Sequence, residues 1–264
     1  MPSASALREQ IEHSLQHRFA AALSPVPRTV CEVAPTGVTE VDRLLDGGLP
    51  VGAISELTGP ESSGRTSLAL AFLSSRTREG RVCAWVDAND SLDPESAAAS
   101  GINLKQLLWV RCGNVEAAVK NKLWTHLDQA IRSTDLLLQA SGFAALVLDL
   151  GSTSPEHASR IPLATWFRFR QAANRTRCSL LVLGRSSFAQ SSAALVLECS
   201  PVRAKTAGQT VLSGFHYQIQ RTRQRNWLTI PRKPPVSTWT APSHWGCEAP
   251  SRQPMNITQM EKRA

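Results

Sequence analysis

The sequence has no Cys-x-x-Cys motif, although six cysteines are spread along it between Cys31 and Cys247. This spacing predicts neither a zinc site nor a disulfide framework, and we expect the cysteines to be mainly small buried hydrophobic residues. The chain also lacks an uncharged apolar run of about 18 residues, the length that a membrane-spanning helix needs. Residues 1–19 carry charges and histidines where a secretory signal peptide would be continuously apolar. We therefore expect a cytoplasmic protein with no membrane partner.

Acidic residues are scarce in the last quarter of the chain. After residue 199 there are ten Lys and Arg but only Glu248 and Glu261, whereas residues 1–199 are balanced, so the net charge of +8 arises at this end. A second acid-free stretch lies between Glu156 and Glu198 and contains six arginines. Such basic surfaces attract phosphate backbones or an acidic partner. A solvated face would look the same, and charge alone leaves the two readings about equal.

The first and last segments differ in character from the middle of the chain. Apolar residues recur every four positions from Leu7 to Leu23, which predicts an amphipathic helix that the prolines of residues 24–28 end. Residues 231–264 are basic and rich in proline, without periodicity, and we expect them to be mostly disordered. Trp239 and Trp245 lie in this tail, where we expect them to contact bases or a partner. We thus divide the chain into an N-terminal helix with linker (1–30), a core (31–230) and a tail (231–264).

The core alternates short apolar runs with helical patterns. Continuous apolar strands between helices predict an α/β fold, with a mostly parallel sheet covered by helices on both faces. The last strands have short connections, so we expect antiparallel strands at that edge of the sheet. The expected strands are 53–58, 81–87, 107–112, 144–149, 178–184, 193–199, 214–221 and 226–230, and the expected helices are 64–77, 115–140 and 156–174.

A glycine-rich segment, GPESSGRTS, begins directly after the first of these strands and runs into the first core helix. Strand, glycine loop and helix in this order are the context of a phosphate-binding loop. The glycines let backbone N–H groups turn toward an anion, and the helix N-terminus adds its positive dipole end. The predicted nucleotide-binding residues are Gly59, Pro60, Glu61, Ser62, Ser63, Gly64, Arg65, Thr66 and Ser67.

Residues 36–94, which include this loop and the later motif WVDANDSLDP, resemble the opening of the RecA recombinase core. The resemblance extends over roughly residues 36–230 and is weak beyond residue 150. It implies a RecA-like P-loop NTPase core that binds ATP with Mg²⁺, and it implies self-association. In LVLDL, Asp149 takes the position that would organise Mg²⁺ through water, while Thr66 would offer its hydroxyl to the metal. Arg221 and Arg223 fall where RecA-like chains carry paired basic residues that reach a neighbour's phosphate. Contact with nucleic acid or solvent is the alternative for this pair.

Three positions depart from the RecA pattern. Arg65 replaces the usual lysine, and a planar guanidinium does not substitute simply for a compact ammonium. Asn89 takes the place of the glutamate that activates water, and a neutral amide cannot accept a proton in that way, although Asp90 lies beside it. No glutamine directly follows CSLLVLG where the family has one that senses the terminal phosphate, and Gln190 comes later in a short connection. Together these changes predict slow or absent ATP hydrolysis with nucleotide binding retained.

Residues 166–170 interleave aromatic residues with arginines, a composition suited to stacking on bases and neutralising phosphates. Helical spacing nevertheless favours Trp166 and Phe167 as core residues. The remaining candidates for contact with DNA are Arg168, Arg175 and Arg185.

Three functions are consistent with these features. The leading hypothesis is an accessory protein of DNA repair and SOS translesion mutagenesis, closest in character to the ImuA-type RecA-like proteins. That resemblance implies single-stranded DNA, a Y-family-like polymerase-derived protein, an error-prone polymerase and RecA as partners. The second hypothesis is a working RecA-type DNA-dependent ATPase, which the altered positions disfavour. The third is a regulatory relative that uses the fold only to bind protein.

Overall fold

The computed structural model describes residues 5–6, 32–112, 126–207, 211–224 and 235–242. The chain divides into two compact units, Met1–Glu32 and Val33–Ala264, and everything below belongs to the second. The helix expected at 5–23 falls outside the described residues except for helical Ser5 and Ala6, and so do residues 115–125, the strand expected at 226–230, and Trp245. Within the described part of the chain, no helix combines the length and apolarity needed to cross a membrane.

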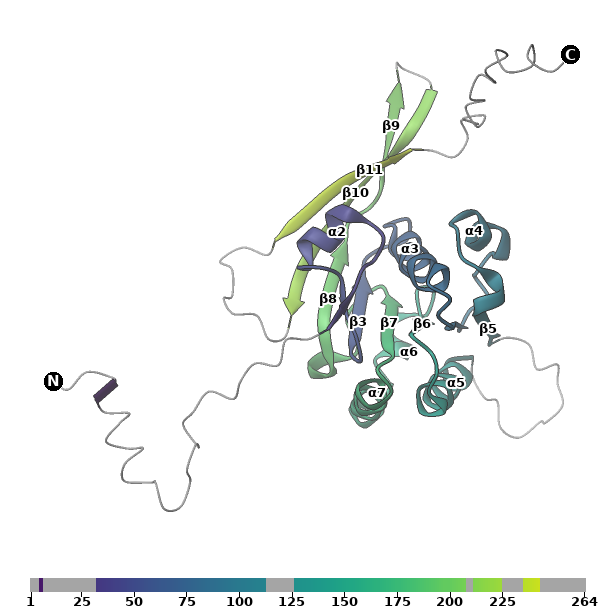
Figure 1. Cartoon of the computed structure of the whole chain (residues 1–264), viewed down its shortest axis with the longest axis vertical. Coiled ribbons are helices and arrows are strands. Elements are labelled where there is room, and N and C mark those ends of the chain that lie inside the picture. The colour runs from purple at the N-terminus through teal and green to yellow at the C-terminus, as the bar shows by residue number, and fades with distance from the viewer. Residues whose placement is uncertain (1–4, 7–31, 113–125, 208–210, 225–234, 243–264) are drawn as a thin grey trace, which may run out of the picture. The chain divides into compact units, whose positions relative to one another are not determined.

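The centre of the molecule is a nine-stranded sheet in the described residues. Six strands are parallel, in the order β8-β3-β7-β6-β4-β5, and β10 continues the sheet antiparallel to β8. Both β9 and β11 pair antiparallel with β10 (Figure 1). The predicted α/β class with antiparallel edge strands is therefore confirmed. The strands are β3 (Ile54–Thr58), β4 (Cys83–Asp87), β5 (Leu107–Arg111), β6 (Ala145–Asp149), β7 (Ser179–Gly184), β8 (Ala193–Cys199), β9 (Arg203–Ala207), β10 (Val211–Gln224) and β11 (Val236–Pro242), besides a small ladder of β1 (Val33–Ala34) and β2 (Leu49–Pro50).

Helices cover both faces of the sheet, which is why the central strands are buried and largely apolar. Every residue of β3, β4, β6 and β7 is buried. One core cluster joins the sheet to α2 (Thr39–Leu44), α3 (Arg65–Arg78) and α4 (Pro94–Ala99). The other joins it to α5 (His126–Ala140), α6 (Pro155–Ala158) and α7 (Leu163–Thr176), as Figure 1 shows. Short 3₁₀ turns lie at Leu104–Gln106 and Gln190–Ser192.

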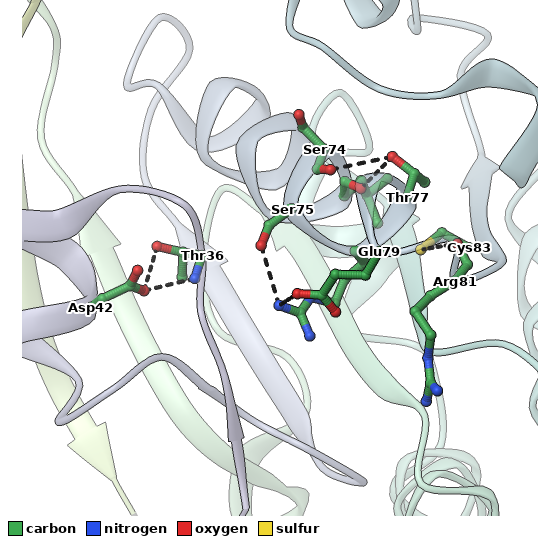
Figure 2. Close-up of polar contacts among 10 residues, drawn as sticks. Thr36, Asp42, Ser74, Ser75, Thr77, Glu79, Arg81 and Cys83 are labelled. Carbon is green, nitrogen blue, oxygen red and sulfur yellow. Dashed lines mark hydrogen bonds and ion pairs between the residues drawn. The ribbon is translucent and has the colours of Figure 1, made fainter.

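Local polar contacts fix the segment before α2 and the end of α3 (Figure 2). Asp42 accepts hydrogen bonds from the backbone N–H and the hydroxyl of Thr36, both at 2.7 Å, and so ties the approach segment to α2. Near the end of α3, the Thr77 hydroxyl donates to the Leu73 carbonyl at 2.8 Å and accepts from the Asn103 N–H at 3.1 Å. These bonds attach α3 to the segment that follows α4.

One expected helix is wrong in extent. Residues 156–174 were predicted as a single helix, but the structure ends α6 at Ala158 and begins α7 at Leu163. Pro162 stands immediately before α7, and proline has no N–H to continue a helix through that point.

Regular structure also occurs in the tail, which we expected to be mostly disordered. Val236–Pro242 forms β11, which pairs with β10 from Gly214 to Gln220. Trp239 stacks on Tyr217 with ring centroids 5.1 Å apart and packs against the core, so its role is in packing. The strand alternates exposed and half-buried residues, a short pattern that the neighbouring prolines obscure in the sequence.

Candidate nucleotide-binding site

The glycine loop spans the turn from β3 into α3, and close approach by other segments explains its glycines. A Cβ at Gly59 would lie 2.3 Å from the Cys199 carbonyl oxygen, and a Cβ at Gly64 would lie 2.6 Å from the Tyr217 ring. Gly64 also has a φ of +81° as the residue that precedes α3. Left-handed backbone at such a turn favours glycine, so the loop can hold this path only with these residues.

Two buried polar groups in the loop have no hydrogen-bond partner among the described residues. They are Ser63 Oγ, in a residue 3% exposed, and Arg65 Nη1, in a residue 8% exposed. Buried donors are normally satisfied, so such groups indicate an absent ligand or solvent. Thr66 and Ser67 face solvent in the first turn of the 14-residue α3, where helix N–H groups favour an anion. The arrangement fits the phosphates of a nucleotide.

Burial lowers the pKa of Arg65, and the nearby carboxylate of Asp149 opposes that shift. Beside the pair, a Cβ at Gly151 would be 3.0 Å from Asp149 Oδ1 and 3.6 Å from Arg65 Nη1. Arg65 therefore lies between the loop and the acidic strand end, where its positive charge can serve a bound phosphate.

Asp149 and Asp87 end the neighbouring parallel strands β6 and β4 opposite each other. Asp149 Oδ1 accepts from the Gly151 N–H at 2.9 Å, and burial, reinforced by the charge of Asp87, raises the pKa of Asp149 to about 6. Asp87 is fully buried and accepts from the Leu92 N–H at 2.8 Å and from Trp109 Nε1 at 3.3 Å. Asp87 was not among the predicted site residues, although an acid at the end of a buried strand was the available indication.

Asn89 is exposed and donates from Nδ2 to Thr153 Oγ1 at 3.3 Å. Asp90, the adjacent acid, does not take its place, because Arg111 holds both carboxylate oxygens, at 2.6 Å and 2.5 Å. The amide of Asn89 cannot act as a general base, and the hydrogen bond from Arg111 lowers the pKa of Asp90, which makes that carboxylate a weaker base.

A cleft of about 890 Å³ opens beside Asn89 at the same edge of the sheet. Its lining includes Thr153, His126, His157 and Arg160, and it contains none of residues 59–67. The cleft is thus separate from the phosphate loop.

The two arginines proposed to reach a neighbour's phosphate are engaged within the chain. Arg221 is buried, with Nη1 2.6 Å from Gln224 Oε1 and 3.4 Å from Asp46 Oδ2. Arg223 Nη2 donates to the Gln190 carbonyl. Reaching a second chain would require both to exchange these partners.

The candidates for DNA contact lie in different surroundings. Arg168 on α7 pairs with Asp135 on α5 at 3.0 Å, whereas Arg175 is exposed about two turns further along α7. Arg185 instead pairs with Glu61 of the phosphate loop. The structure therefore does not bring these three cations together.

The aromatic residues of α7 divide between core and surface. Trp166 is buried as predicted, but the prediction is wrong for Phe167, which is 48% exposed. Phe169 takes the core position and meets Trp166 edge to face at 5.9 Å. The buried stripe follows positions 166, 169 and 173, one step around the helix from the face we expected.

A mostly parallel sheet covered on both faces, with a glycine loop between a buried strand and a helix and an acid at the end of a neighbouring strand, is the architecture of the P-loop class of α/β proteins. The model of the RecA N-terminal domain matches residues 4–149, more than half of the chain. The chain belongs to the RecA family.

Similar proteins agree with this assignment. Protein RecA of Synechocystis sp. (strain ATCC 27184 / PCC 6803 / Kazusa) is 32% identical over 183 residues, which are 67% of this chain and 50% of that protein. Protein RecA of Nostoc sp. (strain PCC 7120 / SAG 25.82 / UTEX 2576) is 36% identical over 139 residues, 52% of this chain and 38% of the relative. For Protein RecA of Bifidobacterium longum (strain NCC 2705) the values are 35% over 141 residues, 53% and 32%. The chain thus matches half or less of the length of these curated relatives.

Proposed function

We propose that this chain is a RecA-fold accessory protein of DNA-damage tolerance that binds ATP at the glycine loop and hydrolyses it slowly or not at all. Residues 59–67 would hold the phosphates, with Ser63 Oγ and Arg65 as side-chain donors. Thr66 and Asp149 are the proposed contacts to Mg²⁺, which when bound would supply charge neutralisation to the phosphates. An accessory role fits a site that keeps its hydrogen-bond donors to phosphate but lacks the general base that would activate water for hydrolysis.

The observation that carries the proposal is the state of the carboxylates around Asn89. Asp90 is held by Arg111 through both oxygens, and Asp87 is buried with its oxygens already accepting hydrogen bonds. A general base must reach its proton with a free lone pair. With an amide at position 89, an Asp90 whose pKa Arg111 lowers and an Asp87 that is buried, we expect the site to activate water poorly while it still binds phosphate.

Within the same proposal, the RecA resemblance supports single-stranded DNA as a ligand and supports self-association. A Y-family-like polymerase-derived protein, an error-prone polymerase and RecA itself are the protein partners that an ImuA-type role implies. Under this proposal the protein acts by scaffolding, so ATP serves as a ligand that selects a conformation or assembly.

The test is ATP binding and turnover by the purified full chain, with and without single-stranded DNA. We expect binding without turnover above background in either condition. Arg65→Ala should abolish binding, because it removes the buried cation of the loop, while Asn89→Glu should raise turnover by at least about tenfold, since general bases typically contribute that much or more. The control is Arg81→Ala. Arg81 is exposed and precedes β4, at the end of the parallel strands opposite the phosphate loop, so its replacement should change neither ATP binding nor turnover.

Two results would contradict the proposal. Unchanged affinity in folded Arg65→Ala protein would remove the glycine loop as the site. Clear DNA-stimulated turnover by the wild type would instead favour a working RecA-type ATPase.

A further inference from the structure

The cleft beside Asn89 has the size of a ligand-binding site. Its volume of about 890 Å³ lies within the usual range for small-molecule sites, roughly 300–1,000 Å³. It opens just after the ends of the parallel strands β4 and β6, and α/β proteins commonly bind ligands at the carboxyl ends of their strands. The nucleotide proposed above does not account for the cleft, because none of residues 59–67 lines it.

Part of the lining is apolar. Leu127 and Ile131 lie one turn apart on α5 and are only partly buried in the core. Ile161 and Pro162 come from the segment between α6 and α7. Covering apolar surface that is open to water is favourable, so these residues suit a ligand with an apolar or aromatic body.

The polar residues of the lining supply mainly hydrogen-bond donors. Arg160 is exposed and forms no ion pair among the described residues, and the imidazoles of His126 and His157 can each donate. Asp128 is the one carboxylate in the described lining, and it is already engaged within the protein. Donors around a cation favour a ligand that also carries an anionic group.

Asn89 lines this cleft from the position where the RecA pattern has the glutamate that activates water. Its Nδ2 donates to Thr153 Oγ1 at 3.3 Å, and Thr153 also lines the cleft. An amide nitrogen carries two hydrogens, so the second remains for a ligand. A glutamate here would instead bring a negative charge into the lining and repel an anion. The replacement that removes the general base therefore suits the cleft to an anionic ligand.

We propose that this cleft binds a small organic anion with an apolar or aromatic body, and that Arg160 and the Asn89 amide donate hydrogen bonds to its polar groups. The site is distinct from the phosphate loop, and its occupation needs no nucleotide there. The chain thus has two ligand sites, one for phosphates and one beside the altered catalytic position.

The experiment measures binding of 8-anilinonaphthalene-1-sulfonate to the folded full chain by fluorescence. This probe combines an aromatic body with a sulfonate and becomes brighter in apolar surroundings. We expect saturable binding that ATP does not displace. Arg160→Ala should weaken it by about tenfold, the usual effect of losing a hydrogen bond to a charged group. Asn89→Asp should weaken it at least as much, because it adds a like charge. Arg81→Ala lies outside the cleft and is the matched control.

A further variant fills the cleft without removing a charge. Ile131→Trp should place an indole in the open space and abolish probe binding, while the midpoint of thermal unfolding stays close to that of the wild type. If this variant does not fold, Arg160→Ala still decides the matter, because an exposed arginine can be replaced without disturbing the core.

Three results would overturn the proposal. The first is unchanged probe affinity in Arg160→Ala and Asn89→Asp. The second is displacement of the probe by ATP, which would place the probe in the phosphate loop. The third is displacement by a single-stranded oligonucleotide that is itself weakened by Arg160→Ala, which would make the cleft a nucleic-acid site. Failure of the wild type to bind ATP would contradict the proposed function but not this site.

Discussion

At the scale of single residues, Asp149 shows how burial sets the chemistry of a carboxylate. Its side chain lies at the end of a fully buried strand with Asp87 opposite, and its pKa is raised from 3.8 to about 6. The folded state therefore favours the protonated form. This contribution to stability is fully present below about pH 4 and is lost as the pH rises through about 6.

The residue-scale prediction follows from that sign. Asp149→Asn cannot ionise but can still accept the Gly151 N–H. The variant should match the wild type in free energy of unfolding near pH 4 and exceed it by about 2–3 kcal/mol at pH 8, as two pKa units imply. Urea unfolding at the two pH values measures this. A difference that does not change with pH would show that the carboxyl is not perturbed in this way.

At the scale of elements, β11 closes one side of the sheet beside the phosphate loop. Its Trp239 stacks on Tyr217, and the ring of Tyr217 lies against Gly64. The paired strands β10 and β11 lie side by side in Figure 1. The Ser237 hydroxyl donates to the Glu40 carbonyl at 3.0 Å and so joins the strand to α2. The strand thus supports both the edge of the sheet and the residue that covers the loop.

Truncation after residue 230, the predicted boundary between core and tail, tests whether β11 stabilises the sheet. A chain ending at residue 230 loses β11, and its free energy of unfolding should fall by at least about 2 kcal/mol through the lost burial of one aromatic residue and the unpaired edge of β10. A chain ending at residue 242 keeps β11 and should resemble the full chain in thermal unfolding. Trp239→Ala in the full chain should reproduce much of the loss. Equal stability of the two truncated chains would show that β11 does not contribute.

At the scale of the whole molecule, the net charge of +8 favours contact with nucleic acid. The surface for that contact depends on which cations have no carboxylate partner. On the face formed by α5 and α7, Arg168 is paired with Asp135, whereas Arg175 is exposed. A cation that already has a carboxylate partner gives up that interaction when it binds phosphate. The fold therefore makes Arg175 the better phosphate contact of the two.

Salt dependence tests the DNA interaction at this scale. Arg175→Ala should weaken single-stranded DNA binding more than Arg168→Ala does. It should also reduce the slope of log affinity against log salt concentration by about 0.7, the value for one phosphate contact on a single strand. Fluorescence anisotropy between low and moderate salt measures both quantities. An unchanged slope in Arg175→Ala would place the DNA contact on another surface.

Local patterns in the sequence determined the α/β class, the central strands and the position of the glycine loop, but they did not predict α2, α4, β9 or β11. Runs such as residues 144–148 and 180–183 are apolar because both faces of a parallel sheet are covered, and each such strand can be identified from its own residues. The replacement of catalytic positions by Arg65 and Asn89 was likewise visible, because it concerns residue identity.

Only the tertiary structure decided which side chains and strands contact one another across the fold. The pairing of β11 with β10, the burial of Arg221 beside Asp46, the hold of Glu56 on residues 187–189 and the contact of Arg185 with Glu61 all join segments far apart in the chain. Periodicity reports which face of an element is buried, but it carries no information on the partner across that face. The raised pKa of Asp149 has the same origin, because desolvation depends on everything packed around a group rather than on its neighbours in sequence.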